Sequence, residues 1–479
     1  MNALPLWSSD AMQAAMRADT SGALPQAITG ISIDSRTIAP GDAYFAIKGA
    51  VHDGHAFVDA ALKAGAALAV VEKAQREKFP SDAPLLIVED VLAGLVDLAR
   101  ASRARLQGQV IAVTGSVGKT STKEALLHVL STQGETHASA ASFNNHWGVP
   151  LSLARCPDTA RFAVFEIGMN HAGEITPLVK MVRPHVAIIT TVEPVHLEFF
   201  PGIEAIADAK AEIFEGVAPD GAAVLNRDNA QFEHLSRRAK ECGISRIVSF
   251  GADKKAEARL IDLSLHATCS AVHAEILGYE VTYKLGMPGR HMAMNSLAVL
   301  AASSLAGADL ALASLSLSQL VPAAGRGVRQ TLNLPGGDIT LIDESYNANP
   351  ASMAAAISVL GKAQIGPQGR RIAVLGDMLE LGATGAELHA GLNDAIKTHH
   401  VDLVYCCGPL MRNLWDALST GKRGGYADSA ANLEAQVLAA IRAGDAIMIK
   451  GSFGSKMKTI VTALEKRFPG KAALDEAAV

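Results

Sequence analysis

The sequence has few cysteines, few aromatic residues and no long apolar run. Only 5% of its 479 residues are aromatic, and its five cysteines lack the CxxC spacing of a zinc or redox site. No apolar run approaches the roughly 20 residues that span a bilayer. The first ten residues also lack the basic and apolar regions of a signal peptide. These absences predict reduced thiols, no membrane span and a cytoplasmic location.

An excess of positive charge is also missing. The formal net charge is −5, whereas a dedicated nucleic-acid binder usually carries a basic face, so we expect no nucleic-acid partner. Hydrophobic residues make up 49% and charged residues 19% of the chain, which is typical of a compact folded protein. The length favours about three domains over one core.

The order of β-rich and helical segments predicts an α/β protein of three domains. Residues 1–106 combine short strands and helices, which indicates a small α+β domain. Residues 107–330 alternate strands with helices, as a mostly parallel sheet does, and residues 271–285 resemble an antiparallel hairpin at its edge. Residues 331–479 repeat the alternation and predict a Rossmann-like domain. The strands expected in the two larger domains cover residues 110–113, 162–167, 186–192, 222–225, 246–250, 339–342, 371–375, 403–406 and 446–449.

A glycine-containing loop follows the first of these strands and precedes a helix expected over residues 119–133. This context favours a phosphate-binding loop, because glycines let backbone N–H groups close around phosphate oxygens at a helix N-terminus. Lys119 is expected to neutralise phosphate charge and Thr120 to bind Mg²⁺. The full pattern has glycine where Val113 stands, so the loop is a shortened form, and an ordinary glycine turn is the alternative. The residues expected around the phosphates of ATP are Thr114, Gly115, Ser116, Val117, Gly118, Lys119 and Thr120.

The shortened loop and three later segments resemble the Mur ligase family, whose central domain carries Thr-Gly-x-x-Gly-Lys-Thr. The later segments are Glu-Ile-Gly-Met-Asn at 166–170, Pro-Val-His-Leu-Glu at 194–198 and Ala-Lys-Ala-Glu-Ile at 209–213. Mur ligases join amino acids or a dipeptide to the UDP-linked muramic acid precursor of peptidoglycan. The resemblance covers nearly the whole chain and implies that ATP and two Mg²⁺ ions are used.

The resemblance also implies a catalytic set of Lys119, Glu166, His196 and Lys210. Thr120 and Glu166 would hold the Mg²⁺ that bridges the ATP phosphates, and His196 would hold a second ion. Lys210 would carry a carbamate derived from CO₂, which makes this lysine an anionic metal ligand. Without the resemblance, Glu166 at the end of an apolar strand suggests a bound cation or hydrogen-bond donor, and a strand-end surface carboxylate is the alternative. His196 and Lys210 would then be a loop histidine and a solvated helix lysine.

Three residues resemble the family's contacts to the rest of the nucleotide. Asn295, in the segment that opens a helix expected over residues 291–305, matches the adenine side. Arg326, between two glycines at the expected domain boundary, matches an arginine that reaches phosphate. Asp343 matches a carboxylate that meets the ribose, although in isolation it is an ordinary strand-end acid.

Two segments resemble the branch of the family that adds D-alanyl-D-alanine to the UDP-muramoyl tripeptide. They are Ser-Tyr-Asn-Ala-Asn-Pro at 345–350 and Leu-Gly-Asp-Met-Leu-Glu-Leu-Gly at 375–382. The first also reads as an Asn/Pro turn that caps a helix. Phe453 stands where arginine is frequent in the family, so its role is open. The residues placed to touch the dipeptide or phosphate are Tyr346, Asn347 and Asn349.

Segments in and after the first domain resemble the family's binding region for the UDP-linked substrate. Arg36 could pair with the diphosphate, since a guanidinium matches it with two hydrogen bonds, but a surface arginine is the alternative. The residues implied on this side are Ser35, Arg36, Lys48, Asn144 and Asn145.

Together these patterns predict a ligase that forms an amide through an acyl phosphate. We expect a monomer whose C-terminal domain closes on ATP, and the sequence leaves open whether the tripeptide ends in diaminopimelate or lysine. A folylpolyglutamate synthetase-like ligase is one alternative, although it has no reason to carry the 345–350 segment. A P-loop nucleotide switch or binding module without ligase activity is another, although it needs no second metal site.

Overall fold

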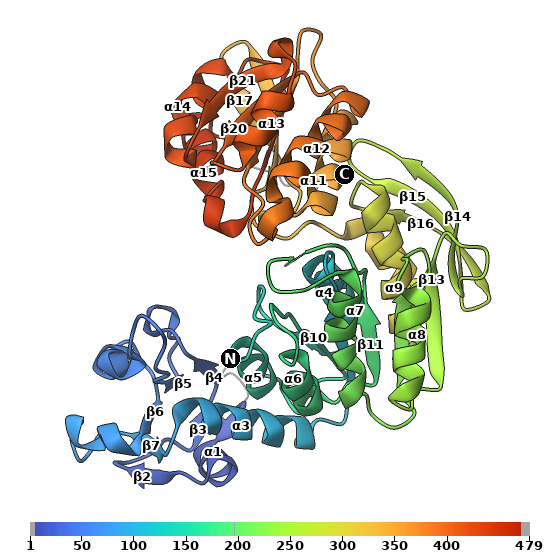
Figure 1. The fold of residues 1–479 in the computed structure, drawn as a ribbon. Helices are drawn as coiled ribbons and strands as arrows, with labels where there is room; N and C mark the ends of the chain where they lie inside the picture. The colour runs from blue at the N-terminus through green and yellow to red at the C-terminus, as the bar shows by residue number, and fades with distance from the viewer. Residues whose placement is uncertain (1–4, 196, 471–479) are drawn as a thin grey trace, which may run out of the picture.

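The computed structural model describes residues 5–195 and 197–470, which form three lobes in chain order (Figure 1). The N-terminal lobe holds a five-stranded sheet in the order β2-β7-β6-β5-β4, in which only β2 runs antiparallel to its neighbour. Its strands are β2 (Asp19–Ser21), β4 (Gly30–Ser32), β5 (Asp42–Phe45), β6 (Leu68–Glu72) and β7 (Leu85–Val88), and a separate pair joins β1 (Trp7–Ser8) to β3 (Ala27–Ile28). The helices are α1 (Ser9–Met16), α2 (Val58–Lys63) and α3 (Val91–Arg105).

The central lobe is built on a nine-stranded sheet in the order β16-β15-β14-β13-β12-β11-β8-β10-β9. The strands from β14 to β9 pair in parallel, and β14, β15 and β16 pair antiparallel at the edge, as the 271–285 hairpin prediction requires. The bounds are β8 (Gln109–Thr114), β9 (Thr136–Ala138), β10 (Phe162–Glu166), β11 (Val186–Ile189), β12 (Ala222–Asn226), β13 (Arg246–Gly251), β14 (Ala258–Leu265), β15 (Ser270–Ile276) and β16 (Tyr279–Leu285).

Helices cover both faces of the central sheet, which is why its parallel strands are almost wholly apolar. One face packs against α4 (Lys119–Ser131), α9 (Arg290–Leu305) and α10 (Leu310–Ser316). The other packs against α5 (Gly148–Ala154), α6 (Ile175–Val182), α7 (Ile203–Ala211) and α8 (Phe232–Glu241). Helix α3 of the first lobe also packs on α5, and the indole of Trp7 donates to the Ala154 carbonyl at 2.8 Å.

The C-terminal lobe holds a six-stranded sheet in the order β17-β18-β22-β19-β20-β21, parallel except for β17. Its strands are β17 (Val328–Leu334), β18 (Gly337–Glu344), β19 (Arg371–Gly376), β20 (Leu403–Cys407), β21 (Arg423–Ala427) and β22 (Ala446–Lys450). One face packs on α11 (Pro350–Gly361), α12 (Gly385–Thr398) and α13 (Met411–Ala417), and the other on α14 (Ala430–Ala440) and α15 (Lys458–Arg467).

This architecture confirms the predicted α/β class with three domains. One predicted element is wrong in extent, because the strand expected over 186–192 ends at Ile189. The reason is that Thr190 turns toward the glycine loop, where its hydroxyl donates to the Val117 carbonyl at 2.5 Å. No helix among the described residues is long and apolar enough to cross a membrane.

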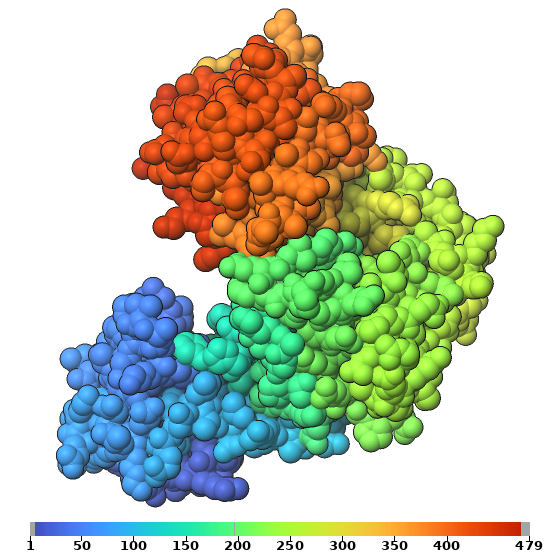
Figure 2. All heavy atoms as spheres, viewed as in Figure 1, coloured from blue at the N-terminus to red at the C-terminus, as the bar shows by residue number. Residues whose placement is uncertain are grey.

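The central sheet brings the ends of β8, β10 and β11 together. These strands are neighbours and parallel, with Glu166 opposite Val113 and Ile189 opposite Thr114. Ligands of open α/β sheets bind outside the carboxyl ends of such strands. Figure 2 shows a broad hollow between the N-terminal and C-terminal lobes.

Candidate active site

The loop between β8 and α4 requires glycine at two positions. Gly115 has φ +145° and Gly118 has φ +88°, backbone conformations that favour glycine. A Cβ on Gly115 would lie 2.0 Å from Oγ1 of Thr190, and one on Gly118 would lie 2.7 Å from Nδ2 of Asn295. Asn295 therefore sits directly against the loop.

Hydrogen bonds from the chain after β11 fix the loop in this shape. The Ser116 N–H donates to the Thr191 carbonyl at 2.8 Å. The Ser116 hydroxyl donates to the Glu193 carbonyl at 3.0 Å and accepts the Glu193 N–H at 2.9 Å. The sequence does not indicate this role of Ser116 and of residues 190–193, since no pattern shows which loop lies beside the glycines.

Oxygen ligands suited to Mg²⁺ gather beside the loop. Oγ1 of Thr120 donates to Oε2 of Glu166 at 2.8 Å, and Nδ2 of Asn144 donates to Oε1 of the same carboxylate at 2.7 Å. Glu166 is only 1% exposed. Asn144, which the sequence predicted for the UDP-linked substrate, therefore contacts the same carboxylate as Thr120. Mg²⁺ prefers one or two protein oxygens together with phosphate oxygens and water, and the pair Thr120 and Glu166 fits that requirement.

Two cations flank this carboxylate. Nζ of Lys119 donates to the Gly115 carbonyl at 2.7 Å. Burial lowers the pKa of Lys119, while the charge of Glu166 raises it and that of Arg326 lowers it. Arg326 reaches across from the C-terminal side: its Nη2 donates to the Ser142 hydroxyl at 3.2 Å, and its guanidinium lies 4.2 Å from the ring centre of Tyr346.

Lys210 is a third cationic group here, and it lies at the end of α7. Its side chain is only 2% exposed, and it forms no hydrogen bond or ion pair within the part of the chain that the structure describes. Burial and then the charge of Lys119 hold the pKa of Lys210 well below its ordinary value. The interpretation of Lys210 as a solvated helix lysine is therefore wrong.

The remaining predicted metal ligand, His196, lies outside the described residues. Across residues 5–195 and 197–470, no group of three His, Cys, Asp or Glu side chains is arranged to hold a metal. A metal here would therefore depend on the hydroxyl of Thr120, the carboxylate of Glu166 and oxygens of the substrate.

A cavity of about 730 Å³ opens from the loop toward the C-terminal lobe. Its central-lobe wall includes the whole loop from Ser116 to Thr120, with Glu166 and Asn295. Its C-terminal wall comes from residues 344–356, 379–381 and 450–454. The volume is in the usual range of small-molecule sites, and the cavity is shared between two domains, a common place for them.

The C-terminal wall contains the segment predicted to meet the second substrate. Asn349 caps α11, because its side chain accepts the Ser352 N–H at 2.9 Å. The Asn347 carbonyl accepts from Nζ of Lys450 at 3.0 Å. Tyr346 lies with its ring centre 6.1 Å from that of Phe453, whose side chain is 76% exposed. The C-terminal wall of the cavity thus combines two asparagines, Asn347 and Asn349, with two aromatic residues, Tyr346 and Phe453.

Asp343 lies beside this cavity without lining it. Its carboxylate accepts from the Ser345 hydroxyl at 2.6 Å and from Nζ of Lys458 at 2.9 Å. The neighbouring Glu344 lines the cavity in its place and pairs with Lys450 at 3.1 Å. A ribose contact by Asp343 therefore needs a different arrangement of the C-terminal lobe.

The predicted contacts of the N-terminal domain lie outside the cavity. Arg36, in the short turn Ser35–Thr37, is 87% exposed and pairs with Asp34 at 2.7 Å. Lys48 is exposed as well. Oδ1 of Asn145 accepts the N–H groups of residues 147 and 148, so this side chain shapes the start of α5.

The fold and the site define a three-domain protein with a shortened phosphate-binding loop, and comparison with known proteins agrees. Residues 27–103 match the family model described as Mur ligase family, catalytic domain. Residues 113–303 match the Mur ligase middle domain, and residues 330–453 match the Mur ligase, glutamate ligase domain. The chain belongs to the Mur ligase family.

Curated relatives match almost end to end. The UDP-N-acetylmuramoyl-tripeptide–D-alanyl-D-alanine ligase of Rickettsia prowazekii is 32% identical over 459 residues, which cover 95% of this chain and 99% of that protein. The enzyme of the same name from Escherichia coli is 33% identical and covers 92% and 94%.

Solved structures agree with the curated relatives. The crystal structure of MurF from Acinetobacter baumannii superposes with a TM-score of 0.82 at 28% identity, covering 97% of this chain and all of that one. The MurF ligase of Thermotoga maritima in complex with ADP gives a TM-score of 0.74 at 26% identity, covering 91% and 97%.

Proposed function

We propose that this protein joins D-alanyl-D-alanine to UDP-N-acetylmuramoyl-tripeptide, with ATP converted to ADP and phosphate. The observation that carries the proposal is the two-sided cavity. Its central wall is a phosphate loop with the paired oxygens of Thr120 and Glu166, and its C-terminal wall is the Tyr346–Asn349 segment. The names of the aligned relatives support the same substrates.

In the first step, a carboxylate oxygen of the tripeptide attacks the γ-phosphorus of ATP, and the bond to the ADP oxygen breaks. This gives an acyl phosphate, which is a far better electrophile than a carboxylate. The loop N–H groups hold the β- and γ-phosphates, while Lys119 and Arg326 stabilise the charge on the transferred group. Mg²⁺ held by Thr120 and Glu166 would supply further charge stabilisation in the same place.

In the second step, the free amine of the dipeptide attacks the acyl carbon, and phosphate leaves from a tetrahedral intermediate. The amine loses one proton as the amide forms. The polar edge of the C-terminal wall, including Asn347 and Asn349, is placed to orient the dipeptide near the transferred group. Closure of the C-terminal lobe would bring both walls together and exclude water.

We further propose that Lys210 becomes carbamylated. The amine nitrogen bonds to the carbon of CO₂ and loses a proton, so a neutral side chain becomes a carbamate anion. Only a neutral amine can react in this way, and burial, which lowers the pKa of Lys210, favours that form. The carbamate would also offset the positive charge of Lys119 and add an oxygen ligand for a second Mg²⁺, together with His196.

The reaction is placed in the cytoplasm, where ATP and nucleotide-linked precursors are available. A monomer suffices, because both walls of the cavity come from one chain.

Release of phosphate from ATP tests the proposal directly. We expect release only when the UDP-linked tripeptide and D-alanyl-D-alanine are both present. Glu387→Gln, which alters an exposed acid on α12, should leave the rate unchanged and serves as the matched control for site variants.

Other substrate requirements would point elsewhere. Release that depends on a folate and glutamate would favour the folylpolyglutamate synthetase-like alternative. Hydrolysis of ATP that neither peptide substrate stimulates would favour a nucleotide switch. Either result would overturn the proposed function.

A further inference from the structure

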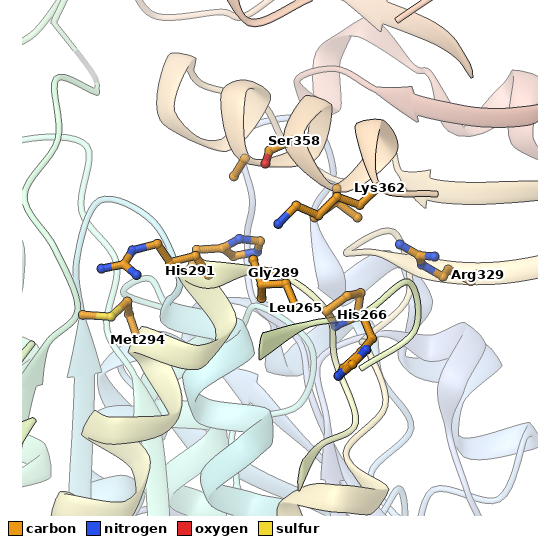
Figure 3. A pocket seen from close by; sticks show the side chains of 12 residues that line it. Leu265, His266, Gly289, His291, Met294, Arg329, Ser358 and Lys362 are labelled. Carbon is orange, nitrogen blue, oxygen red and sulfur yellow. The ribbon is translucent and has the colours of Figure 1, made fainter. Parts of the chain in front are cut away.

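A second cavity, of about 340 Å³, adjoins the nucleotide cavity where the central and C-terminal lobes meet. Figure 3 shows the side chains that line it. Three of its lining residues, His291, Met294 and Ala355, also line the larger cavity. The rest of its wall comes from the tip of β14, the first turn of α9, strand β17 and the second half of α11. The proposed ligase reaction uses none of these other residues.

Arg290, Arg329 and Lys362 give this cavity a cationic lining, and because Arg290 and Lys362 are exposed, the lack of a partner is informative at Arg329 alone. No aspartate or glutamate lines it. None of its six polar side chains forms a hydrogen bond or an ion pair within residues 5–195 and 197–470. These side chains are His266, Arg290, His291, Arg329, Ser358 and Lys362.

Arg329 has two buried nitrogen atoms without a hydrogen-bond partner in the described part of the chain. Its Nε and Nη2 atoms are shielded from solvent and have no hydrogen-bond acceptor among the described residues. Burial lowers the pKa of Arg329, while the charge of Glu344 raises it. Glu344 is already paired with Lys450 at 3.1 Å, so it leaves the guanidinium unsatisfied. Buried donors without acceptors are costly, which indicates a site completed by a ligand.

The arrangement suits a phosphate group. Figure 3 shows Lys362 reaching from α11 toward His291 and Gly289, with Arg329 to one side and His266 below. A guanidinium binds phosphate with two parallel hydrogen bonds, and an ammonium adds a point charge. The cavity also lies at the N-terminus of α9, where Gly289 is the N-cap and the helix dipole favours an anion.

We propose that this cavity is a second anion site, which binds a phosphate group and bridges the central and C-terminal lobes. The volume exceeds that of orthophosphate alone, so the phosphate can be free or can belong to a small phosphomonoester. A phosphate held between α9 and α11 would tie the two walls of the nucleotide cavity together. The inference does not depend on which peptide substrates the protein joins.

Calorimetry on the full-length protein saturated with Mg²⁺ and a non-hydrolysable ATP analogue tests the site, because the phosphate loop is then occupied. Orthophosphate and AMP are titrated separately. We expect binding of one of them at one site per chain. Arg329→Gln and Lys362→Gln should each weaken that binding at least tenfold and change the affinity for the ATP analogue less than twofold.

Lys397→Gln, which alters an exposed lysine on α12 of the same lobe, is the matched control and should bind as the unmodified protein does. Binding of orthophosphate identifies a site for the free ion, and binding of AMP alone identifies one for a phosphomonoester. The proposal is overturned if neither binds the saturated protein, or if binding is the same in both variants. Lys362 is exposed, so its variant gives a valid result even if Arg329→Gln fails to fold.

Discussion

The nucleotide side and the substrate side of this molecule are built differently. Around the phosphate loop, Thr120 and Glu166 are buried and joined by a hydrogen bond, and Ser116 is tied to the chain after β11. Of the residues proposed to meet the UDP-linked substrate and the dipeptide, Arg36 is 87% exposed and Phe453 is 76% exposed. The buried groups around the phosphate loop lie in the central lobe, whereas Arg36 and Phe453 lie on the surfaces of the other two lobes.

This difference indicates that ATP is bound by a preorganised site and that closure of the lobes completes the rest. Preorganised groups act on the transition state without first being ordered, so their removal should lower kcat. Exposed groups that meet a substrate only on binding should mainly change KM. The variants below test this division, from the largest expected effect to the smallest.

Glu166→Gln should have the largest effect, lowering kcat by about 10³-fold, because it removes the charge that pairs with Thr120 and a metal. KM for both peptide substrates should change little. Steady-state phosphate release measures this, with Glu387→Gln as the control. A variant with near-normal kcat and a raised KM for the tripeptide would assign Glu166 to substrate binding. That result would contradict the division between a preorganised nucleotide site and exposed substrate contacts.

Lys210→Ala should lower kcat by about 10²-fold or more if its carbamate takes part in charge stabilisation. Short carboxylates such as acetate should restore part of the rate, since they can occupy the space of the carbamate. Lys240→Ala, on the exposed face of α8, is the control, and carboxylates should not affect it. Absence of any rescue across a series of carboxylate lengths would count against the carbamate.

Arg326→Lys should lower kcat by about tenfold. Lysine keeps the charge, but it loses the planar contact with Tyr346 and cannot bind a phosphate group with two parallel hydrogen bonds. Arg326 contacts Ser142 of the central lobe and Tyr346 of the C-terminal lobe, between which we propose that ATP binds. The KM for ATP should therefore rise as well. Arg442→Lys, on an exposed loop, controls for loss of an arginine elsewhere in the C-terminal lobe. An unchanged kcat would show that Arg326 does not reach the transferred phosphate.

Arg36→Ala should raise KM for the UDP-linked tripeptide by about tenfold with kcat unchanged, as expected for loss of a charge-assisted pair to the diphosphate. Arg17→Ala, in the same lobe, is the control. A normal KM would assign Arg36 only to its ion pair with Asp34.

Phe453→Ala should have the smallest effect, a few-fold rise in KM for the dipeptide and none for ATP. Its ring is exposed at the cavity wall, so its removal costs only a partial apolar contact. A kcat loss comparable to that of Glu166→Gln would mean that the dipeptide side is as finely ordered as the nucleotide side.

Local patterns predicted the nucleotide side well. The glycine loop between a strand and a helix placed Lys119 and Thr120, and a carboxylate at the end of an apolar strand identified Glu166. Parallel neighbours in one sheet then bring these residues together. The contact of Asn144 with Glu166 was not predicted, because the sequence does not reveal which strand its loop approaches.

Features that depend on packing between segments were not predictable. Helical propensity indicates a solvated Lys210, and only the contacts around α7 bury it. The position of Asp343 outside the cavity depends on Ser345 and on Lys458, which lies 115 residues away. The cationic cavity around Arg329 depends on four elements from two lobes and has no sequence signature.

Transfer of oxygen from substrate to phosphate tests the central claim most directly. The tripeptide precursor is labelled with ¹⁸O in both oxygens of its reacting carboxylate and incubated with ATP and D-alanyl-D-alanine. Attack of that carboxylate on ATP predicts one ¹⁸O atom in each phosphate released and the other in the new amide, measured by mass spectrometry. Phosphate without label, formed together with the amide, would contradict the acyl-phosphate account.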